Sequence, residues 1–289
     1  MNRDELRAKI FSKIDELPTL PDVVPKVLDA MEGARSNAMQ VTEIIARDPA
    51  LTSKILRVAN SAYYGFPQEI ADLERAVTLL GFSMVRSLAV SMGVMQSLGS
   101  ARPSSRFPME GLWMHSLAVA TAIKALARRC DRSEGGEQLF VIGLLHDIGK
   151  VVMDQFFADL FEEALEKVEH MEPPRLYVAE RAVIGFDHGE VGAMLLKRWM
   201  FPETIVNPIG AHHQEGVPRG TDPVDLALLR VSDALPQSVG LGDRGSPSMS
   251  DICKDDMQVL GVETKDLESL QALLEEAREG IEAFFSAIR

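Results

Sequence analysis

Five of the six histidines and two aspartates stand where a metal site could use them. In chain order these seven groups are His115, His146, Asp147, His188, His212, His213 and Asp233. Imidazole and carboxylate ligands without thiolate suit Fe, Mn, Zn, Co or Ni rather than Cu(I) or an iron–sulfur cluster. A buried histidine needs only a hydrogen-bond partner, but seven converging groups need the positive charge of one or two cations. Because seven ligands exceed the set of one tetrahedral ion, the pattern predicts a two-metal site bridged by Asp147.

Helical periodicity predicts that three of these groups point into the protein core. His115 shares a helical face with Leu112, and His188 shares one with Leu195. A lone inward histidine is more often a satisfied core residue than a ligand. Asp233 also lies on an apolar stripe, where an ionised carboxylate costs several kcal/mol unless it is paired. Each residue alone has this structural explanation, but the set together favours metal binding.

The pair His146 and Asp147 follows an apolar run, residues 141–145, that we expect to be buried. Adjacent residues on a helix diverge by roughly 100°, so such a pair could serve two neighbouring metals. Lys150 lies four residues after His146 and could meet an anionic substrate oxygen, although for Lys150 taken alone a solvated surface lysine is the preferred interpretation. We take Asp147 and Lys150 as the candidate catalytic residues. Gly192, one turn after His188, leaves room for a group close to its helix.

Composition places limits on partners and compartment. The chain has 289 residues, a net charge of −13 and no Lys/Arg-rich patch, which argues against general nucleic-acid binding. Cys130 and Cys253 have no motif spacing, which fits a reducing compartment. The N-terminus lacks an apolar signal region, and no apolar run approaches the roughly 18 residues of a membrane span. We therefore expect a cytoplasmic protein without a membrane segment.

A period of 3.6 residues dominates the hydrophobic pattern, which predicts an all-α fold. We expect an N-terminal helical subdomain over residues 1–105 and a histidine-bearing helical subdomain over 106–240. Residues 241–289 are predicted to form a loop and a C-terminal helix packed on the body. The Gly-, Ser- and Pro-containing stretches 99–108 and 236–249 are interpreted as a connection and an exposed loop.

From about Leu17 to Leu235 the chain resembles the HDOD proteins, a branch of the HD superfamily. The matching motifs are 17–21, 48–61 and 76–81 in the first part, and 113–116, 143–150, Glu180, 187–192 and 212–213 in the second. The resemblance implies a helical HD-superfamily fold with an N-terminal helical subdomain. It also implies a bacterial signalling or regulatory role, often without demonstrated catalysis.

The related HD-GYP proteins are cyclic-di-GMP phosphodiesterases with two or three metals, typically iron. Their ligand order is similar to the seven groups of this chain, and Lys150 matches the lysine that they carry after the His-Asp pair. Two departures stand out: no Gly-Tyr-Pro follows His212-His213, and Gly111 replaces an acidic residue one turn before His115. The resemblance implies two transition-metal ions, iron first and Mn, Zn, Ni or Co as alternatives, and favours metal binding more than cyclic-dinucleotide cleavage.

Three functions remain open at this point. The first is a signalling module that relays its state to a partner protein, since the chain carries no recognisable receiver, kinase or cyclase segment. The second is a metal-dependent phosphohydrolase acting on a nucleotide or cyclic dinucleotide. The third is a structural role in which metals staple the helices. Asp48, Lys54, Arg57 and Asn60 could form a recognition patch in the first part, but caps and a solvated face explain them more simply.

Overall fold

The computed structural model describes residues 3–16, 19–32, 38–98, 107–132, 136–242 and 245–288. These residues contain helices and no strand, so the all-α prediction is confirmed. The chain forms two compact units. Unit 1 comprises Met1–Leu17 and Ala101–Glu275, and unit 2 comprises Pro18–Ser100 and Glu276–Arg289. The division at 105/106 and 240/241 expected from the sequence stays a prediction.

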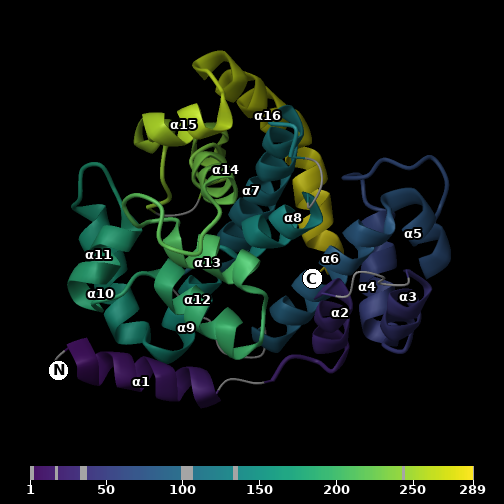
Figure 1. Cartoon of the computed structure of the whole chain (residues 1–289), viewed down its shortest axis with the longest axis horizontal. Coiled ribbons are helices and arrows are strands. Elements are labelled where there is room, and N and C mark those ends of the chain that lie inside the picture. The colour runs from purple at the N-terminus through teal and green to yellow at the C-terminus, as the bar shows by residue number, and fades with distance from the viewer. Residues whose placement is uncertain are drawn as a thin grey trace. The chain divides into compact units, whose positions relative to one another are not determined.

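Unit 2 is built mainly from short amphipathic helices. Its complete helices are α2 (Val23–Glu32), α3 (Ala38–Ala46), α4 (Pro49–Ala59), α5 (Leu73–Leu80) and α6 (Phe82–Leu98). Helix α6 packs against α2, α4 and α5 (Figure 1). Helix α4 begins as its sequence predicts, because the Asp48 side chain accepts from the backbone N–H of Leu51 and Pro49 occupies the first turn.

Unit 1 holds all seven candidate ligands. Its helices are α1 (Arg3–Glu16), α7 (Met109–Arg129), α8 (Gly136–Leu145), α9 (Ile148–Phe156), α10 (Ala158–Glu169), α11 (Leu176–Val183), α12 (His188–Arg198), α13 (Glu203–Ala211), α14 (Pro223–Asp233) and α15 (Lys254–Leu260). Helix α16 (Thr264–Ile288) begins in this unit and ends in unit 2. Within unit 1, α7 packs on α8 and α14, while α12 packs on α9 and α13 (Figure 1).

The contact between α9 and α12 is unusually close. A Cβ added to Gly149 would lie 1.9 Å from the His188 carbonyl oxygen and 2.7 Å from the Gly192 backbone nitrogen. The space predicted beside Gly192 is therefore filled by Ile148 and Gly149 of α9. This approach brings the start of α9, which follows Asp147, against the start of α12, which carries His188.

Two expectations about connecting segments have different outcomes. The stretch 236–249 is not simply an exposed loop: it contains a 3-10 helix, η1 (Pro236–Val239), and Leu241 is buried. Gly245 lies against Leu176, whose N–H donates to the Gly245 carbonyl, so the segment packs onto α11. Most of the connection predicted at 99–108 lies outside the described residues.

No single helix in the described ranges is long and apolar enough to span a membrane. Helices α5 and α6 together reach the required length and composition, but they are bent by 115° with respect to each other.

Candidate metal centre

The seven predicted ligands come from helix interiors, helix ends and breaks between helices. His115 lies within α7, His188 is the first residue of α12, and Asp233 is the last residue of α14. His146 and Asp147 occupy the break between α8 and α9, so the expectation that they are neighbours on one helix is wrong. His212 and His213 directly follow the end of α13 at Ala211.

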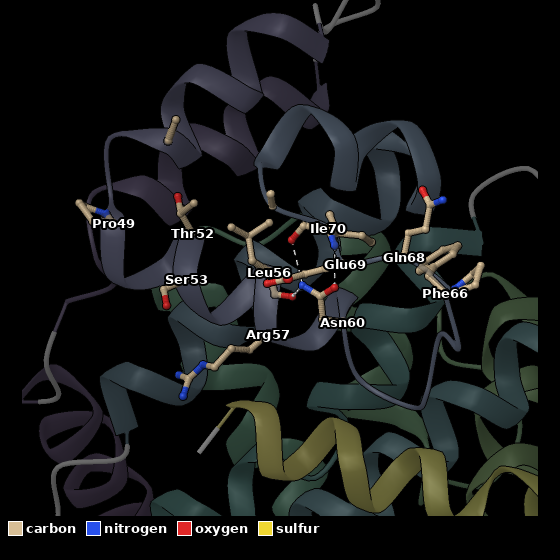
Figure 2. Close-up of a pocket in the computed structure, with 13 residues that line it drawn as sticks. Pro49, Thr52, Ser53, Leu56, Arg57, Asn60, Phe66, Gln68, Glu69 and Ile70 are labelled. Carbon is tan, nitrogen blue, oxygen red and sulfur yellow. Dashed lines mark hydrogen bonds between the residues drawn. The ribbon is translucent and has the colours of Figure 1, made fainter.

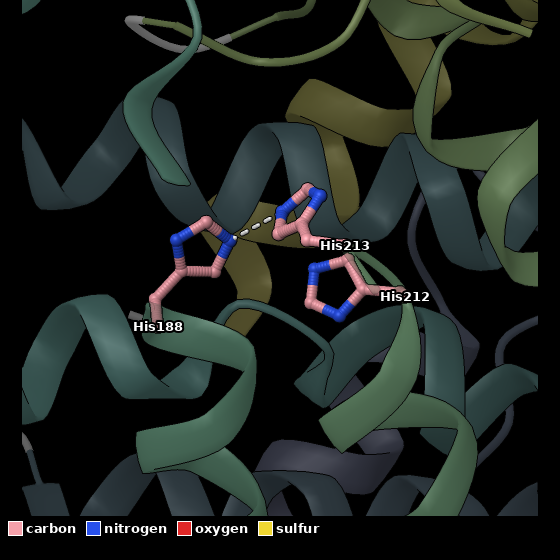
Figure 3. A group of neighbouring side chains, drawn as sticks. All are labelled: His188, His212 and His213. Atoms are coloured by element: carbon pink, nitrogen blue, oxygen red, sulfur yellow. Dashed lines mark hydrogen bonds between the residues drawn. The ribbon is translucent and has the colours of Figure 1, made fainter. Parts of the chain in front are cut away.

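All seven side chains lie in one cluster in unit 1. Their ligand atoms form three overlapping groups of three, each within 4.8 Å: His188, His212 and His213; His115, His146 and Asp147; and His146, His212 and Asp233. Figure 3 shows the first group, in which His188 Nε2 lies 2.9 Å from His213 Nε2. His213 is half-buried and the other six residues are buried.

Local structure sets the orientation of the imidazoles. The Nδ1 atom of His146 lies 2.8 Å from the Gly143 carbonyl oxygen, and that of His212 lies 2.6 Å from the Ile209 carbonyl oxygen. A carbonyl oxygen can only accept a hydrogen bond, so in the neutral form each Nδ1 carries the hydrogen and donates it, and each Nε2 carries a lone pair. The Nε2 atom of His212 is buried without a hydrogen-bond partner, whereas the buried Nε2 atom of His146 faces carboxylate oxygens of the cluster at 3.3 Å. Buried lone pairs of this kind are what a metal ion accepts.

Asp147 lies between two parts of the cluster. Its Oδ1 is 2.9 Å from His188 Nε2, while its Oδ2 is 3.3 Å from His146 Nε2 and 3.7 Å from His115 Nε2. The two oxygens of one carboxylate therefore face different imidazoles, which fits a bridging ligand. Asp233 completes the other side, with its Oδ1 at 2.9 Å from His115 Nε2 and 3.3 Å from His146 Nε2.

The cluster needs positive charge to be stable. Burial alone would lower the pKa of His146 and of His188, but nearby carboxylates raise both to about 10. Asp147 and Asp233 act on His146, and Glu180 and Asp147 act on His188. Burial and the neighbouring histidines lower the pKa of His212 to about 4, which keeps its imidazole neutral. Protons or metal ions can therefore supply the balancing charge.

Lys150 joins the cluster from the first turn of α9. Its side chain is 2% exposed, and its Nζ donates to Asp147 Oδ2 at 2.7 Å. The interpretation of Lys150 as a solvated surface lysine is therefore wrong. The lysine lies where it can stabilise negative charge beside Asp147.

Glu180 of α11 supports His188. The sequence includes it in a family motif, but its spacing alone does not predict this role. Its Oε2 accepts from the backbone N–H of His188 at 2.9 Å and lies 2.7 Å from Nδ1 of the same residue. The carboxylate thus holds Nδ1–H, leaving Nε2 to face the cluster, as carboxylates that hydrogen-bond to metal-binding histidines do. Its spacing of four from the buried Leu176 was the available signal, because it places Glu180 on the inner face of α11.

Two arginines hold the turn that carries His212 and His213. Arg230 of α14 donates to the carbonyl oxygens of Ala211, His212, Gln214 and Gly216 and also pairs with Asp256. Arg181 donates to the His213 carbonyl and to Asp187, the capping residue of α12. The turn therefore depends on side chains from α11 and α14 rather than on helical hydrogen bonds alone.

A cavity of about 330 Å³ in unit 1 reaches the cluster. His212, His213 and Asp233 line it, whereas the other four candidate ligands do not. Tyr177 also contributes to the wall and stacks on His213 with a centroid distance of 4.3 Å. This cavity gives a small molecule a path to the histidine cluster.

A larger cavity of about 910 Å³ lies in unit 2, between α4 and the segment 66–71 (Figure 2). Two residues of the predicted recognition patch have structural roles. Asp48 caps α4, and the Asn60 side-chain amide forms hydrogen bonds with both the N–H and the carbonyl of Ile70 (Figure 2). Arg57 is exposed at this cavity.

The HDOD domain family matches residues 17–215, so the chain belongs to the HDOD family. It is 29% identical over 215 residues to an uncharacterized protein of Treponema pallidum (strain Nichols). The alignment covers 72% of this chain but only 40% of that protein. The chain therefore spans less than half the length of this curated relative.

Solved structures share the fold. An HDOD domain protein of unknown function from Geobacter sulfurreducens is 25% identical, with a TM-score of 0.75 and coverage of 95% of this chain and 98% of that one. A candidate phosphohydrolase from Shewanella amazonensis SB2B is 24% identical, with a TM-score of 0.74 and 98% coverage of both. A candidate signal transduction protein from Marinobacter aquaeolei VT8 is 19% identical, with a TM-score of 0.83 and coverage of 100% and 66%.

Proposed function

We propose that this chain is a bacterial HDOD-type signalling or regulatory protein whose unit 1 holds two transition-metal ions. The observation that carries the proposal is the set of three overlapping groups of potential ligand atoms, each within 4.8 Å, in which the Nε2 atom of His212 is buried and unpartnered. The residues present fit a metal pair of the Fe, Mn, Zn, Co or Ni type, since they offer imidazole and carboxylate donors without thiolate. The seven clustered groups would hold the ions: His115, His146, Asp147, His188, His212, His213 and Asp233.

The signalling role rests on the family and on the departures from the phosphodiesterase pattern. The chain has Gly111 where those enzymes have an acidic residue, and it lacks Gly-Tyr-Pro after His213. One solved neighbour of the same fold is named as a candidate signal transduction protein. We propose that ligand binding at the metal centre shifts the helices of unit 1 and so changes the surface that a partner protein contacts.

Elemental analysis of purified protein tests the metal proposal. We expect about two transition-metal equivalents per chain, because one ion would use only about four to six of the seven donors. Expression in medium supplemented with iron or manganese should raise occupancy if the first preparation is incomplete. Protein that contains no metal even after supplementation would contradict the proposal.

A second candidate function is hydrolysis of a phosphoester, favoured by the cavity that reaches His212, His213 and Asp233. Bound divalent ions would supply Lewis-acid stabilisation of phosphoryl oxygens and activation of water. Asp147 would orient the centre through both of its oxygens, and Lys150 would place a buried cation where negative charge develops. A nucleotide-type ligand fits this chemistry.

The catalytic candidate has its own test. If metal-loaded protein turns over a panel of nucleotides and phosphodiesters, His146→Ala and Asp147→Ala should each abolish turnover, a loss of about 10³-fold or more. Circular dichroism should show that both variants keep their helical content. Absence of wild-type turnover across the panel would leave the signalling role as the better account.

A further inference from the structure

The cavity beside the metal centre has a wall whose charges restrict what can bind there. Its cations are Arg175 and Arg230. Arg175 pairs with Asp251, and Arg230 is engaged by Asp256 and by four carbonyl oxygens. Each guanidinium is therefore already balanced by groups of the protein. Among the residues that line the cavity, these arginines are the only cationic side chains apart from histidines.

The same wall carries additional negative charge. Glu215 lines the cavity and is exposed, and it is not one of the proposed metal ligands. A ligand with several phosphates would have to hold at least one of them near this carboxylate, away from the metal ions. Like charges placed together across a binding surface weaken binding. The largest positive charge in such a site is that of the metal ions themselves.

The cavity is also small. Its volume of about 330 Å³ lies at the lower end of the roughly 300–1,000 Å³ that is usual for ligand sites. Apolar surface on the wall comes from Ala234, Pro247 and Ile252. The Nε2 atom of His212, one of the lining residues, is buried and unpartnered, so the cavity adjoins a donor atom of the proposed metal centre.

We propose that the ligand of this centre is a small phosphate monoester, with one phosphoryl group at the metals and an uncharged body in the cavity, rather than a polyphosphate or a cyclic dinucleotide. This inference rests on the metal centre proposed above. It applies whether the ligand is sensed or hydrolysed, because it concerns recognition alone.

Binding to metal-loaded protein, measured by calorimetry, tests the selectivity. The probes are inorganic phosphate, phenyl phosphate, adenosine triphosphate and cyclic di-GMP. We expect phenyl phosphate to bind at least about tenfold more tightly than either of the two larger anions. Tighter or equal binding of adenosine triphosphate or cyclic di-GMP would overturn the inference. So would the failure of phosphate and phenyl phosphate to bind protein whose metal content is normal.

A charge reversal tests the stated cause. Glu215→Arg should improve the affinity for adenosine triphosphate, relative to phenyl phosphate, by about tenfold. Glu163→Arg makes the same change of charge on an exposed position of α10, away from the cavity, and should leave the ratio unchanged. An unchanged ratio in Glu215→Arg would overturn the inference. Metal-free protein would overturn it together with the proposed function, so measuring metal content separates the two failures.

The route can be tested by blocking it. Cys253 is exposed and lines the cavity, whereas Cys130 is half-buried and does not line it. Alkylation of Cys253 by a bulky maleimide in a Cys130→Ser background should abolish phenyl phosphate binding without removing the metal. Undiminished binding after complete labelling would contradict this cavity as the entrance.

Discussion

Gly149→Ala should destabilise the protein by about 3 kcal/mol, or roughly 10 °C in Tm, and should lower its metal content. The new methyl group would lie 1.9 Å from the His188 carbonyl oxygen and 2.7 Å from the Gly192 backbone nitrogen. Neither atom belongs to a flexible side chain, so α9 and α12 must separate. Because Asp147 precedes α9 and His188 begins α12, their separation pulls apart the contact between Asp147 Oδ1 and His188 Nε2.

Gly111→Ala is the matched control. Gly111 also lies in a helix, but a Cβ there would meet only Pro108 Cγ at 3.7 Å, an ordinary contact. This substitution should be neutral or stabilise by about 0.5–1 kcal/mol, since alanine favours helix more than glycine does. Thermal denaturation and metal analysis of both variants check the prediction. Wild-type Tm and metal content in Gly149→Ala would contradict the close packing of α9 on α12.

Arg230→Met should lower stability by about 2 kcal/mol and remove about one of the two metal equivalents. The guanidinium donates to the carbonyl oxygens of Ala211, His212, Gln214 and Gly216. Its loss therefore frees the turn that carries His212 and His213. It also leaves Asp256 without its partner. The ligands on α7 and at the start of α9 do not depend on this arginine, so one equivalent should remain.

Arg230→Lys should recover little of the metal, because an ammonium group cannot reproduce the planar fork that reaches several carbonyls at once. Arg128→Met makes the same chemical change at an exposed position near the end of α7 and should retain wild-type stability and metal. Metal titration compares the three proteins. Two tightly bound equivalents in Arg230→Met would show that the turn is held by other means.

Periodicity was enough to predict which faces of the helices are buried. The inward positions expected for His115, His188 and Asp233 are confirmed, since all three are buried. The same reasoning failed at His146 and Asp147, because an apolar run of helical character does not reveal where one helix stops and the next begins. The packing of residues 236–249 is not predicted for a related reason. A Gly- and Ser-containing segment has no periodic pattern that would indicate the contact between Gly245 and Leu176.

The supporting residues of the cluster were harder to predict than the ligands. Glu180 could be placed on an inner helix face, but its pairing with His188 depends on how α11 meets α12. Arg230 has no motif spacing, and its role follows from carbonyl oxygens that converge only after the chain turns back beside α14. Such contacts depend on tertiary geometry rather than on local pattern.

Titration of metal-free protein with Mn²⁺, followed by electron paramagnetic resonance, tests the proposed dinuclear centre directly. We expect about two ions to bind and the spectrum of the second to show magnetic coupling, because the two oxygens of Asp147 face different imidazoles. Asp147→Asn should weaken binding and remove the coupling. Binding of a single uncoupled ion to the wild-type protein, or of none, would contradict a dinuclear metal centre.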